Sequence, residues 1–532
     1  MRFCFLIPTA FLLLLTACSE STPDAPKALK AKPKLPTPEV VSVSPTDNGT
    51  TVSLLPTIEV RFSLPMASGL GKELPSDGSC TGAVQLSPDD FQSCAALTRT
   101  GTADQQKTFQ FRPAEPLRRK ARYHLRVTLE AQSKQGAPLK SAYTTGESFP
   151  TKWTITIGAF GDDFGLALHA DAQGRLLVAG ASRFENDDNV SEDGFLALYD
   201  NEGDQQWIQQ PGFGQMPHAV ALAATDSGWR VGVLLPEESG TTLALTNFGE
   251  DGTAEPPVEF TWPWASQGSA LVFDPEGNLL SSGDTRRHLR VNHRRWNQRS
   301  SATLGSGIAV KALALHKRFT LYAGGIVTGP LDGTPATHTQ DGFVMKLDPS
   351  GVKRWSRRLP TAFRDAVTAL AANADGVVAA GVTEGKLRAN VSSLSEALES
   401  GEGTDAFVVR FDAQGSPAWL QQFGTAADEQ VYVVALSDNS TLAIGGSTQG
   451  TFPEQKNAGQ ADAFVTLLDA SGTLLWTRQF GTSGADEVRA LAFLPDGSVV
   501  ATGSVGGSLD GHTHQGGQDV FIVKFDAEGK RR

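Results

Sequence analysis

The C-terminal part of the chain repeats one unit of alternating apolar runs and polar turns. Its clearest copy, residues 431–480, contains the run VYVVAL, a polar turn, TLAIGG, a long polar loop, ADAFVTLLD, a tight turn and LLWTRQF. Each run is short, rich in apolar and β-branched residues, and bounded by Gly, Asp, Asn or Ser, which is typical of a strand. The unit is therefore predicted to contain four antiparallel strands.

Three features recur at corresponding places of the unit: a Trp in the fourth strand, an Asp-small-Phe start of the third strand, and a D-x-x-G turn between them. The tryptophans are Trp153, Trp207, Trp355, Trp419 and Trp476. The aspartates are Asp193, Asp341, Asp405, Asp462 and Asp519. Residues repeated in most copies are expected to serve the fold, the rings by packing between sheets. A period of roughly fifty residues with four strands predicts propeller blades.

The ends of the repeat region predict how the ring closes. The first three strands of the unit occur seven times, and the last copy stops at KFDAEGKRR, where its fourth strand should begin. An isolated fourth strand, KWTITI (residues 152–157), precedes the first copy. We therefore expect residues 152–532 to form seven blades, with strand 152–157 completing the last one.

The stretches FGTSGADEVRALAFLPDGSVVATG and QDVFIVKFDAEG resemble the bacterial seven-bladed β-propeller repeat family (SBBP). The resemblance covers residues 152–532 and is weaker in the second and third copies, which lack the Asp-small-Phe signature. It implies a fold and no particular reaction.

The first residues resemble a bacterial lipoprotein signal. Arg2 precedes the apolar stretch FLIPTAFLLLL, and LTAC ends at Cys18. The resemblance implies that residues 1–17 are removed and that Cys18 is acylated, which would attach the protein to a membrane; Ser19 after the cysteine suggests the outer membrane by analogy. An uncleaved anchor is the alternative, but the apolar run is shorter than the roughly 20 residues of a membrane span. The Pro-, Ala- and Lys-rich remainder of residues 18–38 is expected to be an extended tether.

Residues 39–151 are expected to form a separate β-sandwich, because their apolar and polar residues alternate. The phrases SPTDNGT, VRFSLPM, FQFRPAEPL and YHLRV resemble the S-layer-type bacterial Ig-like domain, which implies a spacer or adhesion module. Cys80 and Cys94 both lie here, and an exported chain favours a disulfide between them over metal or redox chemistry. The predicted fold class is therefore all-β, an Ig-like sandwich followed by a seven-bladed propeller.

Composition excludes some partners and motifs exclude some reactions. The net charge of −12 argues against nucleic-acid binding, and 55 glycines with only 20% charged residues suit a turn-rich β-protein. The sequence contains no G-x-S-x-G, H-E-x-x-H or P-loop motif, and no catalytic residue is assigned.

One face of the propeller is expected to carry the long loops. The loops between second and third strands are long, as in STQGTFPEQKNAGQAD, whereas turns of the opposite face are short, as in LPDGS and DASG. Binding sites concentrate on long loops held by a rigid scaffold. This loop-rich face is therefore predicted to contact a protein or a surface glycan. His338 and His514 lie in these loops; metal binding is one interpretation, and solvent exposure, which is commoner for single loop histidines, is the favoured one.

Acidic pairs are expected on the same face, where one blade passes to the next. They are Asp162, Asp163, Asp428, Glu429, Asp486 and Glu487. A ring of carboxylates suits Ca²⁺, which takes six to eight oxygen ligands. The alternative is that each carboxylate accepts hydrogen bonds from its own turn. The absence of a D-x-[DN]-x-[DN]-G loop favours this alternative, so no cofactor is predicted and Ca²⁺ is kept as a hypothesis.

A basic segment interrupts the acidic background in the third copy. Its arginines include Arg286, Arg287, Arg290, Arg294 and Arg295. Arginine forks suit phosphate and carboxylate groups, so an anionic partner such as lipopolysaccharide is one hypothesis. A solvated outer face is the favoured alternative.

Two functions from different classes fit these features. The first is a cell-envelope lipoprotein that acts as a non-enzymatic binding or scaffolding module through the loop-rich face. The second is an envelope polysaccharide hydrolase or lyase with carboxylates on the same face. Repetition of the acidic pairs between blades favours the first.

Overall fold

A computed structural model describes residues 35–532 in part. The description leaves out residues 46–51, 53–55, 72–77, 116, 119–120, 147, 151–152, 159–160, 187–188, 211–216, 218, 238–239, 263–269, 275–278, 284–287, 293–298, 304–306, 317–319, 334–339, 349–350, 362, 388–402 and 513. Cys18, His338 and the side chains of the basic segment therefore lie outside the described residues.

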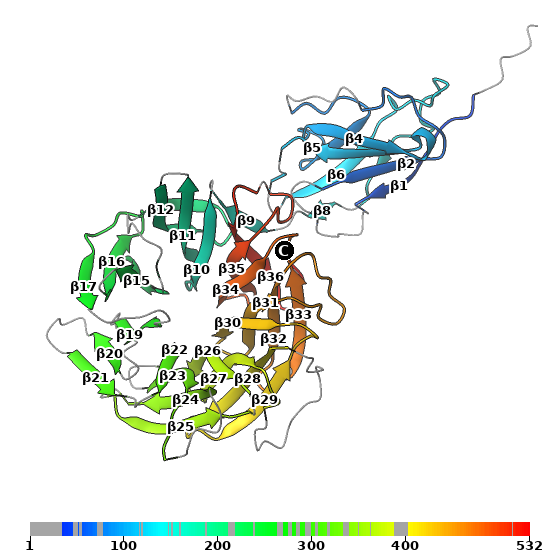
Figure 1. The fold of residues 1–532 in the computed structure, drawn as a ribbon. Helices are drawn as coiled ribbons and strands as arrows, with labels where there is room; N and C mark the ends of the chain where they lie inside the picture. Colours follow the sequence, from blue (N-terminus) through cyan, green and yellow to red (C-terminus); the bar gives the residue numbers. More distant parts are fainter. Residues whose placement is uncertain are drawn as a thin grey trace, which may run out of the picture.

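The N-terminal domain is a sandwich of two four-stranded sheets, which Figure 1 shows beside the ring, next to β9. The first sheet has the order β1-β2-β5-β4, and the second joins β3, β6 and β7, with β8 also pairing β6. The strands are β1 (Val40–Ser44), β2 (Ile58–Phe62), β3 (Val84–Ser87), β4 (Leu97–Ala103), β5 (Thr108–Pro113), β6 (Arg122–Val127), β7 (Tyr143–Thr144) and β8 (Phe149–Pro150). One 3₁₀ turn, η1 (Asp104–Gln106), joins β4 to β5. Alternating apolar residues of both sheets, such as Val60, Phe109 and Leu125, form its core.

Seven four-stranded antiparallel sheets follow and form a ring (Figure 1). Blade 1 contains β10 (Asp162–Ala170), β11 (Leu176–Asn186), β12 (Asn189–Tyr199) and β13 (Gln205–Gln209). Blade 2 contains β14 (Ala219–Thr225), β15 (Gly228–Glu237), β16 (Gly240–Gly249) and β17 (Val258–Trp262). Blade 3 contains β18 (Leu271–Phe273), β19 (Leu279–Gly283), β20 (His288–Asn292) and β21 (Arg299–Thr303).

The other four blades carry the clearer sequence copies. Blade 4 contains β22 (Ile308–His316), β23 (Thr320–Val327), β24 (Asp341–Leu347) and β25 (Lys353–Leu359). Blade 5 contains β26 (Asp365–Asn373), β27 (Gly376–Thr383), β28 (Asp405–Asp412) and β29 (Pro417–Phe423). Blade 6 contains β30 (Glu429–Leu436), β31 (Leu442–Thr448), β32 (Asp462–Leu468) and β33 (Leu474–Phe480). Blade 7 contains β34 (Asp486–Phe493), β35 (Val499–Val505), β36 (Asp519–Phe525) and β9 (Thr154–Ile157). The predicted fold class is confirmed.

Blade 7 is built from both ends of the propeller sequence. Its outer strand is β9, which pairs antiparallel with β36 so that Ile155 lies opposite Ile522. Trp153, just before β9, is 1% exposed. The ladder joins residues more than 360 positions apart, so the ring is closed by hydrogen bonds between its first and last strands.

Tryptophan side chains tie each blade to the next at the outer rim. The indole N–H of Trp419, in blade 5, donates to Ala470 O in the third-to-fourth-strand turn of blade 6 at 3.1 Å. The ring packs under Gly472, whose φ of +84° permits the turn and whose Cβ would lie 2.7 Å from the indole. Trp153, Trp207, Trp355 and Trp476 make the same bond to the following blade. The Trp of one blade and the D-x-x-G turn of the following blade therefore form a single contact between the two blades.

A bulge in the first strand explains a repeated glycine of the second strand. In blade 6 the register shifts between Val431 and Val433, opposite Gly446. A Cβ on Gly446 would lie 1.8 Å from Gln430 O, so a side chain cannot be accommodated without moving the strand. Blades 1, 4, 5 and 7 repeat the bulge.

Candidate functional site

In blades 4 to 7, the long loop between the second and third strands is anchored by one apolar side chain. The second-to-third-strand loops of blades 4 to 7 carry Leu331, Leu387, Phe452 and Leu509. All four are at most 6% exposed and belong to the cores between blades. The anchor follows a repeated G-x-Leu or G-x-Phe pattern, a sequence signal that we did not use to predict it.

In blades 4, 5 and 6 a polar side chain of the fourth strand holds the anchored loop to the blade; in blade 4 it is Arg358, which donates to Gly329 O. In blade 6, Gln479 Nε2 donates to Gly450 O at 2.9 Å and to Asp462 Oδ2 at 2.8 Å. Its Oε1 accepts the N–H of Phe452 at 3.0 Å. Gln422 makes the equivalent bonds in blade 5. Sequence reasoning missed these residues, although both stand in the repeated stretch Q-F-G-T, which begins at Gln422 and at Gln479 and was a usable signal.

Four of the aspartates that begin the third strands are buried, Asp341, Asp405, Asp462 and Asp519, whereas Asp193 is half-buried. Asp462 is fully buried, and its Oδ2 also accepts the N–H of Ala458 in the preceding loop at 2.8 Å. Asp519 Oδ2 accepts the N–H of Gln515 at 2.9 Å in the same way and contacts His514 Nδ1 at 2.8 Å. His514 is therefore not the exposed loop residue that the sequence suggested, because it packs against a buried carboxylate.

A second buried carboxylate opens the first strand of four blades: Asp163, Asp365, Glu429 and Asp486. Glu429 accepts hydrogen bonds from Thr425 N and Thr425 Oγ1 at 2.8 Å and from Thr448 Oγ1 at 2.6 Å. Burial raises the pKa of Glu429 and of Asp486, and the neighbouring carboxylates Asp405 and Asp462 raise each further. These acids hold the turn that enters each blade.

The two members of each acidic pair of the sequence differ in environment. Asp428 Oδ1 accepts the N–H of Thr404 at 2.9 Å, and Asp162 is half-buried at the start of β10. Glu487 pairs with Arg489 at 2.6 Å, and Arg489 lies over the ring of Tyr432. Among the described residues, no group of three or more His, Cys, Asp or Glu side chains is placed to hold a metal ion. The sequence pairs therefore do not converge on one Ca²⁺ site in the described part of the ring.

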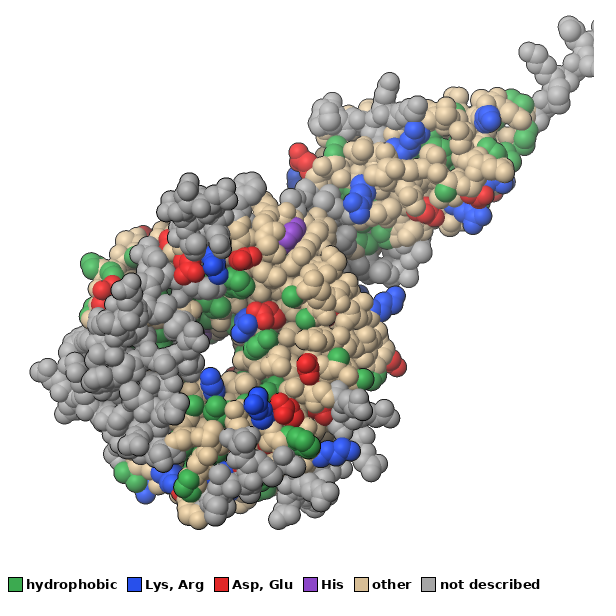
Figure 2. Space-filling model, in the orientation of Figure 1, with side chains coloured by type: hydrophobic (Ala, Val, Ile, Leu, Met, Phe, Trp, Pro, Cys, Tyr) green, Lys and Arg blue, Asp and Glu red, His purple; other side chains and the backbone are tan. Residues whose placement is uncertain are grey.

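The predicted anion patch lies almost entirely outside the described residues. Arg286, Arg287, Arg294 and Arg295 are not described, and Arg290 is placed only as a backbone position of β20. Figure 2 shows charged side chains of both signs around the central opening of the ring.

A cavity of about 910 Å³ lies between blades 2 and 3 near the short turns, away from the long loops. Its polar lining includes Arg230, Asn247, Glu255 and His169. Arg230 Nε donates to Asn247 Oδ1 at 2.7 Å, and Asn247 Nδ2 donates to Glu255 Oε2 at 2.6 Å. Burial lowers the pKa of His169, so its imidazole is neutral at pH 7. The sequence did not predict this cavity, because its lining comes from strands far apart in the sequence, including His169 of blade 1 and Leu315 of blade 4.

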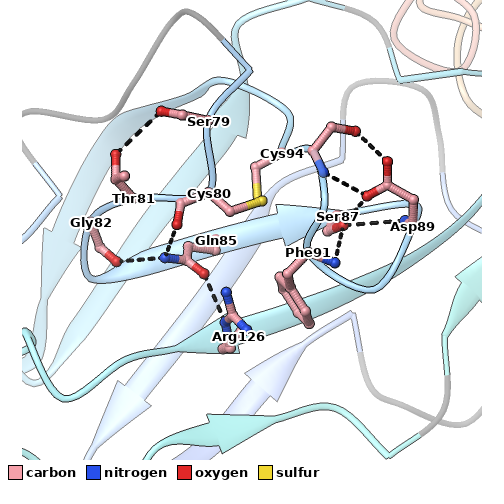
Figure 3. The surroundings of a disulfide bond; sticks show 11 residues. Ser79, Cys80, Thr81, Gly82, Gln85, Ser87, Asp89, Phe91, Cys94 and Arg126 are labelled. Atoms are coloured by element: carbon pink, nitrogen blue, oxygen red, sulfur yellow. Dashed lines mark hydrogen bonds between the residues drawn. A yellow bond between two sulfur atoms is a disulfide. The ribbon is translucent and has the colours of Figure 1, made fainter.

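The predicted disulfide between Cys80 and Cys94 is present in the sandwich, with Cα atoms 5.0 Å apart (Figure 3). Gln85 Nε2 donates to Cys80 O at 2.9 Å, and its Oε1 accepts from Arg126 at 2.7 Å. Hydrogen bonds from Ser93 lower the pKa of the nearby Asp89 to about 2. The disulfide and these bonds fix the long connection between β3 and β4.

Residues 36–151 match the bacterial Ig-like domain family. The regulatory protein FlaEY of Caulobacter vibrioides is 29% identical over 182 residues, which cover 33% of this chain and 19% of that protein. The chain thus spans about a fifth of the length of this curated relative.

Two solved structures illustrate the likeness of the ring. Virginiamycin B lyase from Staphylococcus aureus is 9% identical with a TM-score of 0.39, covering 69% of this chain and 98% of that one. The β-propeller domain of the trilobed protease from Pyrococcus furiosus is 9% identical with a TM-score of 0.39, covering 71% and 96%. At these identities the likeness concerns the fold alone. No helix among the described residues is long and apolar enough to cross a membrane.

Proposed function

We propose that the protein is a cell-envelope lipoprotein whose propeller is a non-enzymatic binding or scaffolding module. The lipid on Cys18 would anchor it, the tether and Ig-like domain would hold the ring away from the membrane, and the loop-rich face would contact a protein or surface glycan. The Ig-like domain supports an envelope or extracellular location. The Caulobacter relative is named a regulatory protein, and a binding role is compatible with that name.

The observation that carries this proposal is that acidic side chains at the loop-rich face accept hydrogen bonds within the fold. Asp163, Glu429 and Asp486 are buried and accept hydrogen bonds from their own blade. A hydrolase needs an acid and a base that reach the substrate. These carboxylates instead rigidify the turns and loops, as suits a surface that presents fixed loops to a partner.

Exposed loop residues provide the test. The blade 6 loop presents Glu454, Lys456 and Asn457 to solvent, while Phe452 anchors it. The full chain with Glu454→Ala, Lys456→Ala and Asn457→Ala should fold normally and lose a partner that the unchanged chain captures from envelope extract. The matched control changes exposed turn residues of the opposite face, Asp438→Ala and Asn439→Ala. A partner lost only with the control would place binding on the short-turn face.

A further inference from the structure

The junction between blades 6 and 7 buries two carboxylates side by side. Asp462 opens β32 and Asp486 opens β34, and they are 0% and 1% exposed. The backbone joins them, because Asp486 N donates to Ala461 O at 2.7 Å. A Cβ on Gly481 would lie 2.3 Å from Asp486 Oδ2 and 2.8 Å from Asp462 Oδ1. The two oxygens, one from each blade, therefore face the same point.

The hydrogen-bond partners of both carboxylates are neutral. Asp486 accepts from Thr482 N at 2.5 Å, Thr482 Oγ1 at 2.9 Å and Gly506 N at 3.0 Å. Asp462 Oδ2 accepts from Ala458 N and from Gln479 Nε2, both at 2.8 Å. Asp462 Oδ1 is buried and has no hydrogen-bond partner among the described residues. Two buried negative charges without a positive partner are strongly unfavourable.

The junction between blades 4 and 5 brings its own cation, whereas the junction between blades 5 and 6 repeats the neutral glutamine, since Gln422 Nε2 donates to Asp405 Oδ2 at 2.8 Å. Gln479 lies opposite Phe464, and in blade 4 the corresponding position, opposite Phe343, is Arg358. Arg358 is ion-paired with Asp341, the blade 4 counterpart of Asp462.

The junction between blades 7 and 1 has a different basic partner. There His514 contacts Asp519, the counterpart of Asp462 in blade 7. At the Asp462–Asp486 junction, Gln479 stands where blade 4 has Arg358. Both carboxylates are retained there, and their hydrogen-bond partners are neutral.

We propose that this junction binds one hard cation, with Ca²⁺ as the probe, between Asp462 Oδ1 and Asp486 Oδ2. Ca²⁺ takes carboxylate oxygens at about 2.3–2.6 Å, and its charge offsets the burial of both acids. Only two carboxylates meet here, so water or backbone oxygens complete the coordination shell. The ion would tie blade 6 to blade 7, independently of any partner on the loop-rich face.

The test compares cation binding in the unchanged full chain and two variants. After EGTA treatment and dialysis, the unchanged chain should bind Ca²⁺ saturably and gain melting temperature as CaCl₂ is added, with KCl keeping the ionic strength constant. Asp462→Asn should lose one bound Ca²⁺ per chain. Gln479→Arg, which copies blade 4, should lose the same ion yet melt in EGTA at least as high as the unchanged chain in EGTA.

Three outcomes would overturn the proposal. The unchanged chain could show no calcium response at all. Both variants could keep the full response, which would place the ion elsewhere. The melting temperature could instead rise on acidification without any effect of CaCl₂, and Asp462→Asn could remove that rise, which would indicate a proton shared by the two carboxyl groups.

Discussion

Replacing Trp153 by alanine should weaken the closure of the ring more than any other change to a rim tryptophan. Its ring is 1% exposed and packs against Gly203 of blade 1, and its N–H donates to Glu202 O at 2.7 Å. A buried Trp removes roughly 150–250 Å² from water, or about 4–6 kcal/mol at about 25 cal/mol per Å². Because alanine keeps part of this contact, we expect a loss of about 3–5 kcal/mol in the free energy of unfolding.

Trp207 provides the matched control. It makes the same bond to the next blade, to Glu250 O at 2.9 Å, but its ring is only half-buried. Trp207→Ala should therefore cost about half as much. Urea unfolding followed by circular dichroism measures the loss, and hydrogen exchange in β9 and β36 locates it. Equal costs for the two variants, or unchanged exchange in β36 of Trp153→Ala, would refute closure through Trp153.

Three further predictions address acidity, backbone and the disulfide. Burial raises the pKa of Glu429, so this group stabilises the fold at low pH and loses that contribution as the pH rises through the raised pKa. Glu429→Gln should therefore raise the melting temperature more at about pH 8 than at about pH 4. An equal shift at the two pH values would contradict this. Gly446→Ala places a Cβ 1.8 Å from Gln430 O and should lower the free energy of unfolding by about 3 kcal/mol or more, as measured by urea unfolding. A loss below about 1 kcal/mol would show that the bulge relaxes. The double variant Cys80→Ser/Cys94→Ser should lower the sandwich's stability by about 3 kcal/mol and leave the propeller's calorimetric transition unchanged; a shifted propeller transition would mean that the two domains unfold together.

The candidate site was only partly predictable. The sequence pairs, such as Asp428 and Glu429, suggested one carboxylate ring, but only one member of each pair takes the buried place at the start of the first strand. Successive residues of a strand point to opposite faces, so neighbours in sequence do not share a site. The carboxylate that raises the pKa of Glu429 is Asp405, on another blade and 24 positions earlier. No local pattern reports such a pairing.

The sequence alone determined the all-β class and the sandwich followed by the ring, because strand periodicity and turn residues are local and recur in most copies. It also predicted the disulfide, because Cys80 and Cys94 lie in one small domain of a chain expected to be exported. The tertiary structure decided what the repeats do: each Trp donates to the following blade, Gln479 joins a loop to Asp462, and the cavity between blades 2 and 3 opens near the short turns. The Gln479 contact depends on how a loop folds back over its own blade, and the other two features depend on how one sheet packs against the next. That packing brings together residues about fifty positions apart, a distance over which the order of residues carries no geometric information.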